Sequence, residues 1–329
     1  MNYRQFGKTD LRVSEIGFGA WAIGGAATVG NIPIGWGHTD DATSEQALLE
    51  ALDAGINFFD TADFYGLGHS EELIGKVLGA NQNAIIATKV GHRNIDNKIV
   101  LDYSKKYILS ACEESLKRLK RDSIDYYQLH SARLDHLHHG ECIEAMEELK
   151  QNGKVRYWGL SLNTFHPQPE AEYLIDLKKG DGFQLVFNLI NQRADEVLKL
   201  AARAGFGVIA RMPLQFGLLT GKFNKNSSFK QGDHRAFRLT PEIIEKANQK
   251  LNDAAWSEAD KMGIGKTSLA LSYILSHHEI NTVIPGIRTP EQVHLNTVDL
   301  RQLDASLIKE LEHPERKWNE IVELMERQG

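Results

Sequence analysis

The chain has 329 residues, of which 42% are hydrophobic and 25% are charged, and its formal net charge is −6. This composition is that of an ordinary globular protein with enough apolar material for a large core. The acidic balance argues against a nucleic-acid binder, which is normally basic, but it is compatible with a small phosphorylated ligand in a local cationic pocket.

No segment approaches the ~18 apolar residues of a membrane span, and residues 1–6 contain no apolar stretch of signal-peptide type. The two cysteines, Cys112 and Cys142, fit small core or surface residues in a reducing compartment. We therefore expect a soluble cytoplasmic protein that has neither a nucleic acid nor a membrane as partner.

Strand-like and helix-like segments alternate along the chain. Short β-prone apolar runs predict strands at 16–20, 56–60, 84–89, 125–130, 155–161, 183–187, 207–211 and 282–285. Apolar residues at helical spacing predict helices between them, among others at 44–54, 107–119, 142–149 and 197–204. Gly55, Gly153 and Gly205 each follow a helical stretch, where a left-handed cap favours glycine.

Eight strands alternating with helices imply a parallel sheet, because parallel strands need crossover connections. The strands are nearly continuous apolar runs, as in sheets covered on both faces. Both an open doubly wound sheet and a closed (β/α)8 barrel fit this pattern. The segment 17–22, GFGAWA, lacks the third glycine of the open sheet's fingerprint, and eight units favour the barrel. We predict a single (β/α)8 TIM-barrel domain over residues 1–329.

The interval between the last two predicted strands is unusually long. It contains a polar loop at 224–238 and an amphipathic stretch from Thr240 to Met262, in which Thr240 followed by Pro241 predicts a helix start. A long loop after the seventh strand of a barrel is a candidate lid over a ligand. A terminal helix is predicted after Leu303.

Three of the predicted strands end in residues that can transfer or hold protons. Asp60, Lys89 and His130 each follow an apolar run, and Tyr65 lies five residues after Asp60. Barrel active sites lie at the carboxyl ends of the strands, so we expect these four side chains to share one rim. The set suits proton transfer to or from a carbonyl or alcohol oxygen.

An unperturbed phenol has a pKa of about 10, which is high for proton transfer at neutral pH. A nearby ammonium favours the phenolate, and lowering the pKa by ~3 units requires ~4 kcal/mol of differential interaction. We expect Lys89 to lower the pKa of Tyr65 in this way, and Asp60 to keep the buried ammonium charged.

Each of these residues also has an ordinary structural interpretation. An isolated aspartate such as Asp60 is about as often the cap of a turn as a functional residue. Tyr65 fits a packing residue, and Lys89 can extend to solvent. A lone histidine such as His130 is more often a hydrogen-bonded core residue. The occurrence of all four at successive strand ends favours the joint interpretation.

The residues around this set resemble a known family. The segments 55–66 (GINFFDTADFYG), 70–75 (SEELIG), 86–89 (IATK) and 125–130 (DYYQLH) closely resemble motifs of the aldo-keto reductases, particularly the bacterial and channel β-subunit-like branch. The resemblance extends over nearly the whole chain. It implies a (β/α)8 barrel with an N-terminal β-hairpin cap and NADP-linked carbonyl reduction. It assigns Tyr65 as proton donor, with Asp60, Lys89 and His130 completing the catalytic tetrad.

The resemblance also implies a cofactor site. It places Ser161 and Gln184 on the nicotinamide carboxamide, with the sequence Ser161-Leu162-Asn163 departing from the family's Ser-Asn pair. Arg211 occupies the position of an aromatic that stacks on the nicotinamide, and a guanidinium plane can also stack. The remaining expected contacts follow the same correspondence: Gly19, Ala20, Trp21, Asp60, Met212, Pro213, Leu214, Gly217, Lys222, Arg235, Gly286, Gln292 and Asn296.

Arg288 is the reason to expect NADP rather than NAD, because a guanidinium can bind a 2′-phosphate with two hydrogen bonds. NAD stays an alternative cofactor, and a surface arginine is the ordinary interpretation of this residue. The expected substrate is a small carbonyl or sugar-like molecule, in a pocket lined by Trp21, Trp36, Phe64 and His92.

Two other functions are compatible with parts of the sequence. One is a nicotinamide-nucleotide-sensing regulatory subunit with little turnover, and the other is a metal-dependent barrel hydrolase, for which only His130 supplies a strand-end ligand. His136, His138 and His139 form a histidine cluster that fits a solvated loop better than a metal site. The segment 263–267, GIGKT, ends like a phosphate loop but fits a helix-start turn better.

Overall fold

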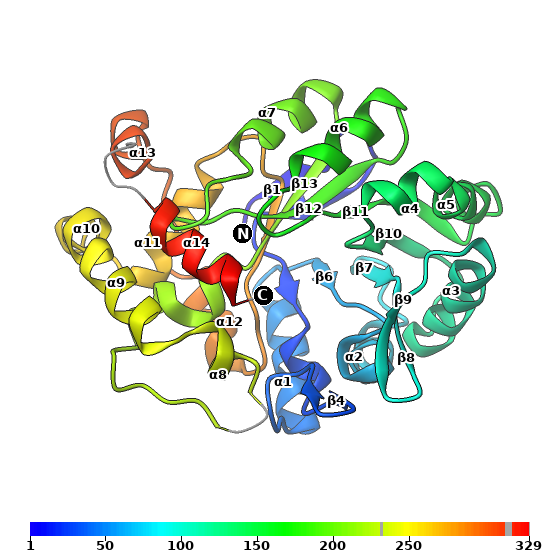
Figure 1. The fold of residues 1–329 in the computed structure, drawn as a ribbon, viewed down its shortest axis with the longest axis horizontal. Helices are drawn as coiled ribbons and strands as arrows, with labels where there is room; N and C mark the ends of the chain where they lie inside the picture. The colour runs from blue at the N-terminus through cyan, green and yellow to red at the C-terminus, as the bar shows by residue number, and fades with distance from the viewer. Residues whose placement is uncertain (231–232, 313–317, 329) are drawn as a thin grey trace.

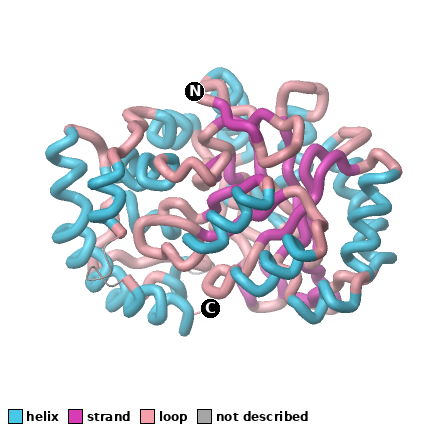
Figure 2. Tube along the Cα trace, turned by 90° about the horizontal axis from the view of Figure 1, so that it is seen from above, coloured by secondary structure: helices cyan, strands magenta, loops and turns pink. Residues whose placement is uncertain are grey.

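The computed structural model describes residues 1–230, 233–312 and 318–328. Strands occupy its centre and helices surround them (Figure 1, Figure 2). The central sheet consists of β3 (Phe18–Gly19), β6 (Phe58–Asp60), β7 (Ile85–Val90), β10 (Ile124–His130), β11 (Val155–Ser161), β12 (Gly182–Val186), β13 (Gly207–Arg211) and β14 (Thr282–Ile284). These eight strands match the eight that the apolar runs predict.

The sheet closes into a barrel. Its strands are parallel and follow one another in chain order, from β3 to β14. Parallel bridges join Ile16 to Val283 and Gly19 to Gly286, and the amide of Gly19 donates to the carbonyl of Pro285 at 2.9 Å. The first and last strands therefore meet, so the closed barrel is confirmed and the open-sheet alternative is wrong.

Helices connect successive strands, and the predicted helical stretches lie within them. Those before β13 are α1 (Asp41–Asp53), α2 (His69–Leu78), α3 (Lys105–Leu119), α4 (Leu134–His139), α5 (Glu141–Gln151), α6 (Gln168–Asp176) and α7 (Asp195–Ala204). Gly55, Gly153 and Gly205 have φ of +84°, +74° and +73°. They end helices in the left-handed region, as predicted.

The long interval after β13 is largely helical. It contains the 3-10 segment η3 (Gln215–Thr220), the helices α8 (Arg235–Arg238), α9 (Pro241–Leu251), α10 (Ser257–Met262) and α11 (Lys266–Leu275), and the π-helical segment η4 (Asn252–Trp256). The Thr240 side chain accepts from the amide of Ile243, which confirms the predicted helix start. The predicted polar loop includes the short helix α8, and its residues 231–232 lie outside the described ranges.

The chain after β14 forms α12 (Pro290–Thr297), α13 (Ala305–Leu311) and α14 (Asn319–Arg327). The described part of the predicted terminal helix forms α13 and α14, and residues 313–317 between them lie outside the described ranges. Gly263 ends α10 with φ of +64° and Gly265 precedes α11. The GIGKT segment is therefore a turn that starts a helix, as expected. None of the helices in the described ranges is long and apolar enough to cross a bilayer.

A hairpin of β1 (Tyr3–Gln5) and β2 (Arg12–Ser14) covers the amino-terminal end of the barrel, as the resemblance implies. Phe6 follows β1, is fully buried, and packs edge-on against Tyr126 with ring centroids 5.0 Å apart. A Cβ at Gly207 or Gly182 would lie 2.6 or 2.8 Å from the Phe6 ring. The glycines at the starts of β12 and β13 thus leave the space that this ring fills.

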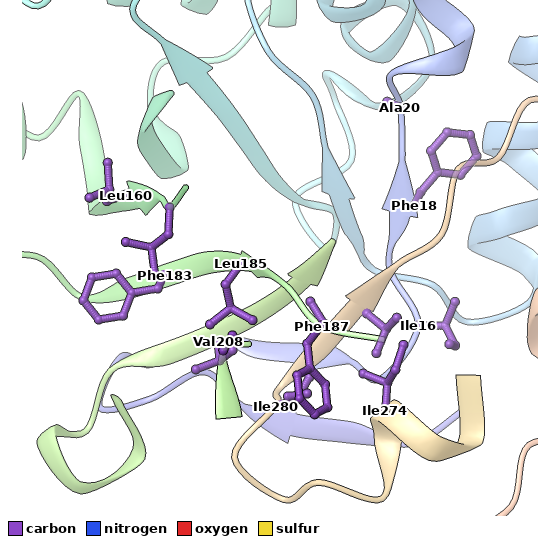
Figure 3. Packing of buried hydrophobic residues seen from close by; sticks show 14 of the residues in the cluster. Ile16, Phe18, Ala20, Leu160, Phe183, Leu185, Phe187, Val208, Ile274 and Ile280 are labelled. Atoms are coloured by element: carbon purple, nitrogen blue, oxygen red, sulfur yellow. The ribbon is translucent and has the colours of Figure 1, made fainter. Parts of the chain in front are cut away.

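The larger hydrophobic core lies between the strands and the surrounding helices. Figure 3 shows Leu160, Phe183 and Val208 pointing from neighbouring strands into it. Phe187 stacks on Tyr273 of α11 with centroids 5.8 Å apart. Burying these side chains outside the sheet fixes the strands, so that their carboxyl ends can carry polar residues.

Two small hairpins flank the carboxyl end of the barrel. They are β4 (Thr28–Val29) with β5 (Ile32–Pro33), and β8 (His92–Ile95) with β9 (Lys98–Leu101). They touch each other, because a Cβ at Gly30 would lie 2.7 Å from the carbonyl oxygen of Asn97.

Candidate active site

A cavity of about 500 Å³ opens at the carboxyl ends of the strands. This volume is in the range of small-molecule sites. Its lining includes residues from the carboxyl-terminal parts of six strands or just beyond them: Asp60, His130, Ser161, Gln184, Arg211 and Gly286. Its walls carry aromatic side chains and residues of both small hairpins.

The four side chains of the predicted proton-transfer set lie together at this cavity. Nζ of Lys89 donates to the hydroxyl of Tyr65 at 3.2 Å and to Oδ2 of Asp60 at 2.6 Å. The ring of His130 lies edge-on to that of Tyr65, with centroids 5.9 Å apart and an interplanar angle of 84°. Asp60, Tyr65 and His130 line the cavity, and Lys89 lies fully buried behind them.

Asp60 is held by more than the ammonium. Its Oδ1 accepts from the side-chain amides of Gln184 at 2.7 Å and Gln128 at 3.1 Å, both from neighbouring parts of the barrel interior. Its carboxylate caps no turn, and Lys89 does not extend to solvent, so both of these ordinary interpretations are wrong. The strand ends instead form one hydrogen-bonded polar network inside the barrel.

The pKa values of Lys89 and Tyr65 reflect a balance between burial and charge. Burial lowers the pKa of Lys89, but attraction to Asp60 and Tyr65 outweighs it, so the pKa lies above its usual value. Burial raises the pKa of Tyr65 by more than the charge of Lys89 lowers it. The expected net lowering is therefore wrong for the protein alone, because phenolate formation requires the burial of a new charge. The phenol keeps its proton at neutral pH.

His130 is a neutral side chain at neutral pH. Burial, reinforced by the neighbouring His92 and Lys89, lowers its pKa well below the usual range. Its Nδ1 is buried and has no hydrogen-bond partner among the described residues. The ring of His92 lies with its centroid 4.3 Å from that of His130, and burial lowers the pKa of His92 to about 4. A neutral imidazole here can donate one hydrogen bond and accept another.

Most residues expected to contact a cofactor line the same cavity. They are Gly19, Trp21, Asp60, Ser161, Gln184, Arg211, Met212, Pro213, Leu214, Gly217, Arg235, Gly286 and Gln292. Four expected residues lie outside its wall, namely Ala20, Lys222, Arg288 and Asn296. Ala20 is fully buried, and its carbonyl accepts from the hydroxyl of Ser70.

The departure at Asn163 has a local structural explanation. Oδ1 of Asn163 accepts from the backbone amides of Phe165 and His166 at 2.8 and 2.9 Å, which closes a turn. Ser161 lines the cavity, whereas Asn163 does not. Only the serine of the family's Ser-Asn pair is therefore presented to the cavity.

The cavity fits a nicotinamide dinucleotide in two respects. Gly286 lines it, and open space lies where a Cβ would be at this position. Nε2 of Gln184 donates to Asp60 and Gln128, while its Oε1 has no partner among the described residues. That oxygen is available to accept from a carboxamide.

The segment after β13 forms one wall of the cavity in an unusual backbone conformation. Met212, Gln215 and Phe216 have φ of +53°, +44° and +56°. Left-handed conformations at residues other than glycine are strained and are concentrated at functional sites. The strain here turns the chain so that Met212, Leu214 and Phe216 all line the cavity.

His234 and Arg238 also line the cavity, and sequence reasoning missed both. His234 stacks on Trp21 with centroids 4.4 Å apart and lies edge-on to Trp36 at 4.5 Å. Both of its ring nitrogens lack a partner among the described residues, and burial lowers its pKa to about 3. The available signal was the cluster of cations and aromatics in the predicted lid loop.

Arg235 is engaged within the same loop. Its guanidinium pairs with Asp233 at 2.6 Å and lies 4.9 Å from the centroid of the Trp36 ring. The four residues expected to line a substrate pocket, namely Trp21, Trp36, Phe64 and His92, are all in the cavity wall. Within the described ranges, no three His, Cys, Asp or Glu side chains come together in a way that could hold a metal ion.

Comparison with known proteins connects this geometry to a family. The profile of the Aldo/keto reductase family matches residues 15–314. An uncharacterized oxidoreductase, YqkF of Bacillus subtilis (strain 168), is 33% identical over 321 residues, which cover 95% of this chain and 96% of YqkF. L-galactose dehydrogenase of Arabidopsis thaliana is 31% identical over 313 residues, or 92% of this chain and 89% of the relative.

A probable voltage-gated potassium channel subunit beta of Oryza sativa subsp. japonica is 27% identical over 310 residues and 89% of each chain. Among solved structures, the holo form of aldo-keto reductase AKR11C1 from Bacillus halodurans matches with a TM-score of 0.77, 30% identity and 95% coverage of both chains. Glycerol dehydrogenase AKR11B4 from Gluconobacter oxydans matches with a TM-score of 0.80, 29% identity and 97% coverage of both.

Proposed function

The chain belongs to the aldo/keto reductase family, and from that premise we propose that it is an NADP-dependent oxidoreductase. It reduces aldehyde or ketone carbonyls, or oxidises the matching alcohols and sugars, and Tyr65 is the proton donor. The observation that carries the proposal is the position of the Tyr65 hydroxyl, which lies 3.2 Å from a buried ammonium in the wall of the strand-end cavity.

Each residue of the tetrad has a role that its surroundings support. When bound, the nicotinamide supplies the hydride that adds to the carbonyl carbon. Tyr65 gives its proton to the carbonyl oxygen, and the O–H electron pair stays on the phenolate. Lys89 donates to that phenolate oxygen and stabilises its charge, and Asp60 keeps Lys89 protonated. The neutral His130 orients the carbonyl oxygen by donating a hydrogen bond.

The proposed cofactor contacts combine residues of the cavity wall with residues beyond it that the family resemblance supplies. Ser161 and Gln184 hold the carboxamide, with Oε1 of Gln184 as acceptor. The segment 212–217 covers the pyrophosphate, and Lys222 and Arg235 supply cations to it. Arg288 and Asn296, with Gly286 and Gln292, hold the adenosine end. The guanidinium of Arg288 makes no ion pair with a described residue, which supports its assignment to a 2′-phosphate.

A carbonyl panel tests the reaction and the cofactor together. The protein is mixed with NADPH or NADH and with aliphatic, aromatic and sugar aldehydes and ketones, and nicotinamide absorbance is followed. The alcohols are tested with NADP⁺ and NAD⁺. We expect consumption of NADPH with at least one carbonyl class, and preference for NADPH over NADH. Absence of turnover with every pair would refute the proposal.

The variant Tyr65→Phe tests the proton donor. We expect turnover to fall by roughly 100- to 10,000-fold, the usual contribution of a positioned acid, with NADPH affinity preserved. Normal turnover in this variant would refute the role of Tyr65.

The similarity to a channel β subunit favours a second function, nucleotide sensing with little turnover. The complete tetrad favours the enzyme instead. Slow release of bound nicotinamide in a protein that turns over no carbonyl would favour the sensor.

A further inference from the structure

Arg211 is a cation in the wall of the cavity that forms no ion pair with a described residue. Its Nη2 donates to the carbonyl of Leu162 and to Oγ1 of Thr164, both at 3.1 Å, and its Nη1 contacts the sulfur of Met212 at 3.2 Å. Its Nε is buried and has no partner among the described residues. Every polar partner of this guanidinium in the described ranges is therefore neutral.

The surroundings of Arg211 disfavour its charge. Burial lowers the pKa of Arg211 to about 10, because attraction to Tyr65 and Asp60 offsets only part of the cost of burial and the charge of Arg238 adds to it. A buried charge without a partner is costly, and it persists where a ligand supplies the opposite charge. The neutral hydrogen bonds fix the plane of the guanidinium, and the part of Arg211 that lines the cavity is left for such a ligand.

The cavity contains no free carboxylate to serve as that partner. Asp60 is the only acidic residue in its described lining, and both of its oxygens are occupied by Lys89, Gln128 and Gln184. Arg235 already pairs with Asp233. Arg238 has a buried Nε without a partner in the described ranges, so a second cation faces the same cavity. The cavity is thus cationic in a chain of net charge −6.

The position of Arg211 indicates which ligand it serves. Arg211 ends β13 and lies close enough to Tyr65 for each to act electrostatically on the other. The carbonyl that receives the proton of Tyr65 must lie at that hydroxyl, and Arg211 lines the same cavity, so one small substrate can face both residues.

We infer that Arg211 binds a carboxylate or phosphate of the substrate, so that the preferred substrates are short carbonyl compounds carrying an anionic group. The inference rests on the function proposed above and names its substrate class. The face of the guanidinium stays available for stacking on a nicotinamide, because anions bind at the N–H edge.

Matched substrate pairs test the class with NADPH as reductant. Butanal is compared with 4-oxobutanoate, the same chain with a terminal carboxylate, and glyceraldehyde with glyceraldehyde 3-phosphate. We expect kcat/KM to favour at least one anionic member over its neutral partner by roughly 10- to 100-fold. In Arg211→Met we expect the ratio of kcat/KM between the anionic and neutral members to fall to about one, whatever change both members share, and in Arg211→Lys part of the preference remains. Arg12→Met, which removes an exposed positive charge at the opposite end of the barrel, leaves the preference unchanged.

A binding experiment separates this inference from the proposed reaction. Succinate or inorganic phosphate is titrated into the cofactor-free protein, and the fluorescence of Trp21 and Trp36, which line the cavity, is followed. We expect a saturable change in the wild type and in Arg12→Met, and none in Arg211→Met. Saturation with equal affinity in Arg211→Met would overturn the inference, as would equal kcat/KM for both members of both pairs. Failure to reduce any aldehyde would refute the reaction, and the titration would still decide the anion site.

Discussion

The ammonium of Lys89 lies 2.6 Å from Oδ2 of Asp60, and both side chains are almost completely buried. Such a pair contributes little net stability when intact, but removing one partner leaves an unpaired charge in the barrel. We predict that Asp60→Asn lowers the free energy of unfolding by about 3–5 kcal/mol, and that Asp60→Asn combined with Lys89→Met lowers it by less. Urea denaturation of the two variants and the wild type measures both. A single variant as stable as the wild type would contradict this account.

The raised pKa of Tyr65 predicts a late titration. Because burial raises this pKa above the usual value of about 10, the phenol of Tyr65 keeps its proton up to that pH in the protein alone. We expect the difference in tyrosinate absorbance between wild type and Tyr65→Phe to be flat up to pH 10. Tyrosinate that forms from Tyr65 between pH 7 and 9 would show that its pKa is lowered, as the sequence led us to expect, and would contradict the raised pKa.

The buried imidazole of His234 predicts an acid-sensitive fold. The pKa of His234 is about 3 in the folded protein, below the ordinary value of 6.5. Between these two pH values the imidazole is therefore protonated in the unfolded chain and neutral in the folded chain. Stability is therefore present above pH 6.5 and is lost as pH falls from 6.5 towards 3. We predict that His234→Phe, which also removes two unpartnered nitrogens, loses less stability between pH 7 and 5 than the wild type.

Thermal melts across this pH range provide the measurement. His278→Phe is the control, because that residue is almost fully exposed. Parallel melting curves for wild type and His234→Phe at pH 7 and pH 5 would argue against a buried neutral imidazole.

The open space at Gly286 predicts a change in ligand affinity without a change in fold. Since no atom lies within 4 Å of a Cβ built there, Gly286→Val should fold normally. Its side chain enters the cavity, so NADPH affinity should fall by about tenfold or more, measured by fluorescence titration. Gly265→Val, at a position where a Cβ would lie at an ordinary contact distance of 3.7 Å from Oγ of Ser268, should bind NADPH like the wild type. Unchanged affinity in Gly286→Val would place the cofactor elsewhere.

The ring of Phe6 predicts a stability effect at the end of the barrel remote from the cavity. Phe6→Ala removes a fully buried ring that Gly182 and Gly207 leave space for, and we expect a loss of about 3–5 kcal/mol with NADPH affinity preserved. Tyr3→Ala, which truncates a side chain of the same hairpin that is 40% exposed, should cost about 1 kcal/mol or less. Equal losses in the two variants would show that the ring does not stabilise the barrel.

The strands and their polar ends could be predicted because each is a local signal. An apolar run that stops at Asp60, Lys89 or His130 marks both the strand and the side chain at its end. The parallel-sheet rule then brings the three together without any knowledge of distances. The helix ends at Gly55, Gly153 and Gly205 could be predicted for the same reason.

Other features depend on contacts between segments far apart in the chain. His234 and Arg238 belong to a polar loop, and nothing local indicates that Trp21 and Trp36 enclose the histidine. The direction of the pKa shift of Tyr65 required knowing how deeply the phenol is buried, which a sequence pattern does not give. The turn closed by Asn163 likewise depends on the local conformation of the following backbone.

The bridge between Gly19 and Gly286 has a consequence for how the protein acquires its ligand site during synthesis. The wall of the cavity combines residues near the start of the chain with residues near its end. A nascent chain that still holds its final segment in the ribosome has an unclosed sheet edge and half a binding site. If the proposed cofactor binds here, it can stabilise the protein only after translation is almost complete, so the growing chain must reach that point without a bound nucleotide.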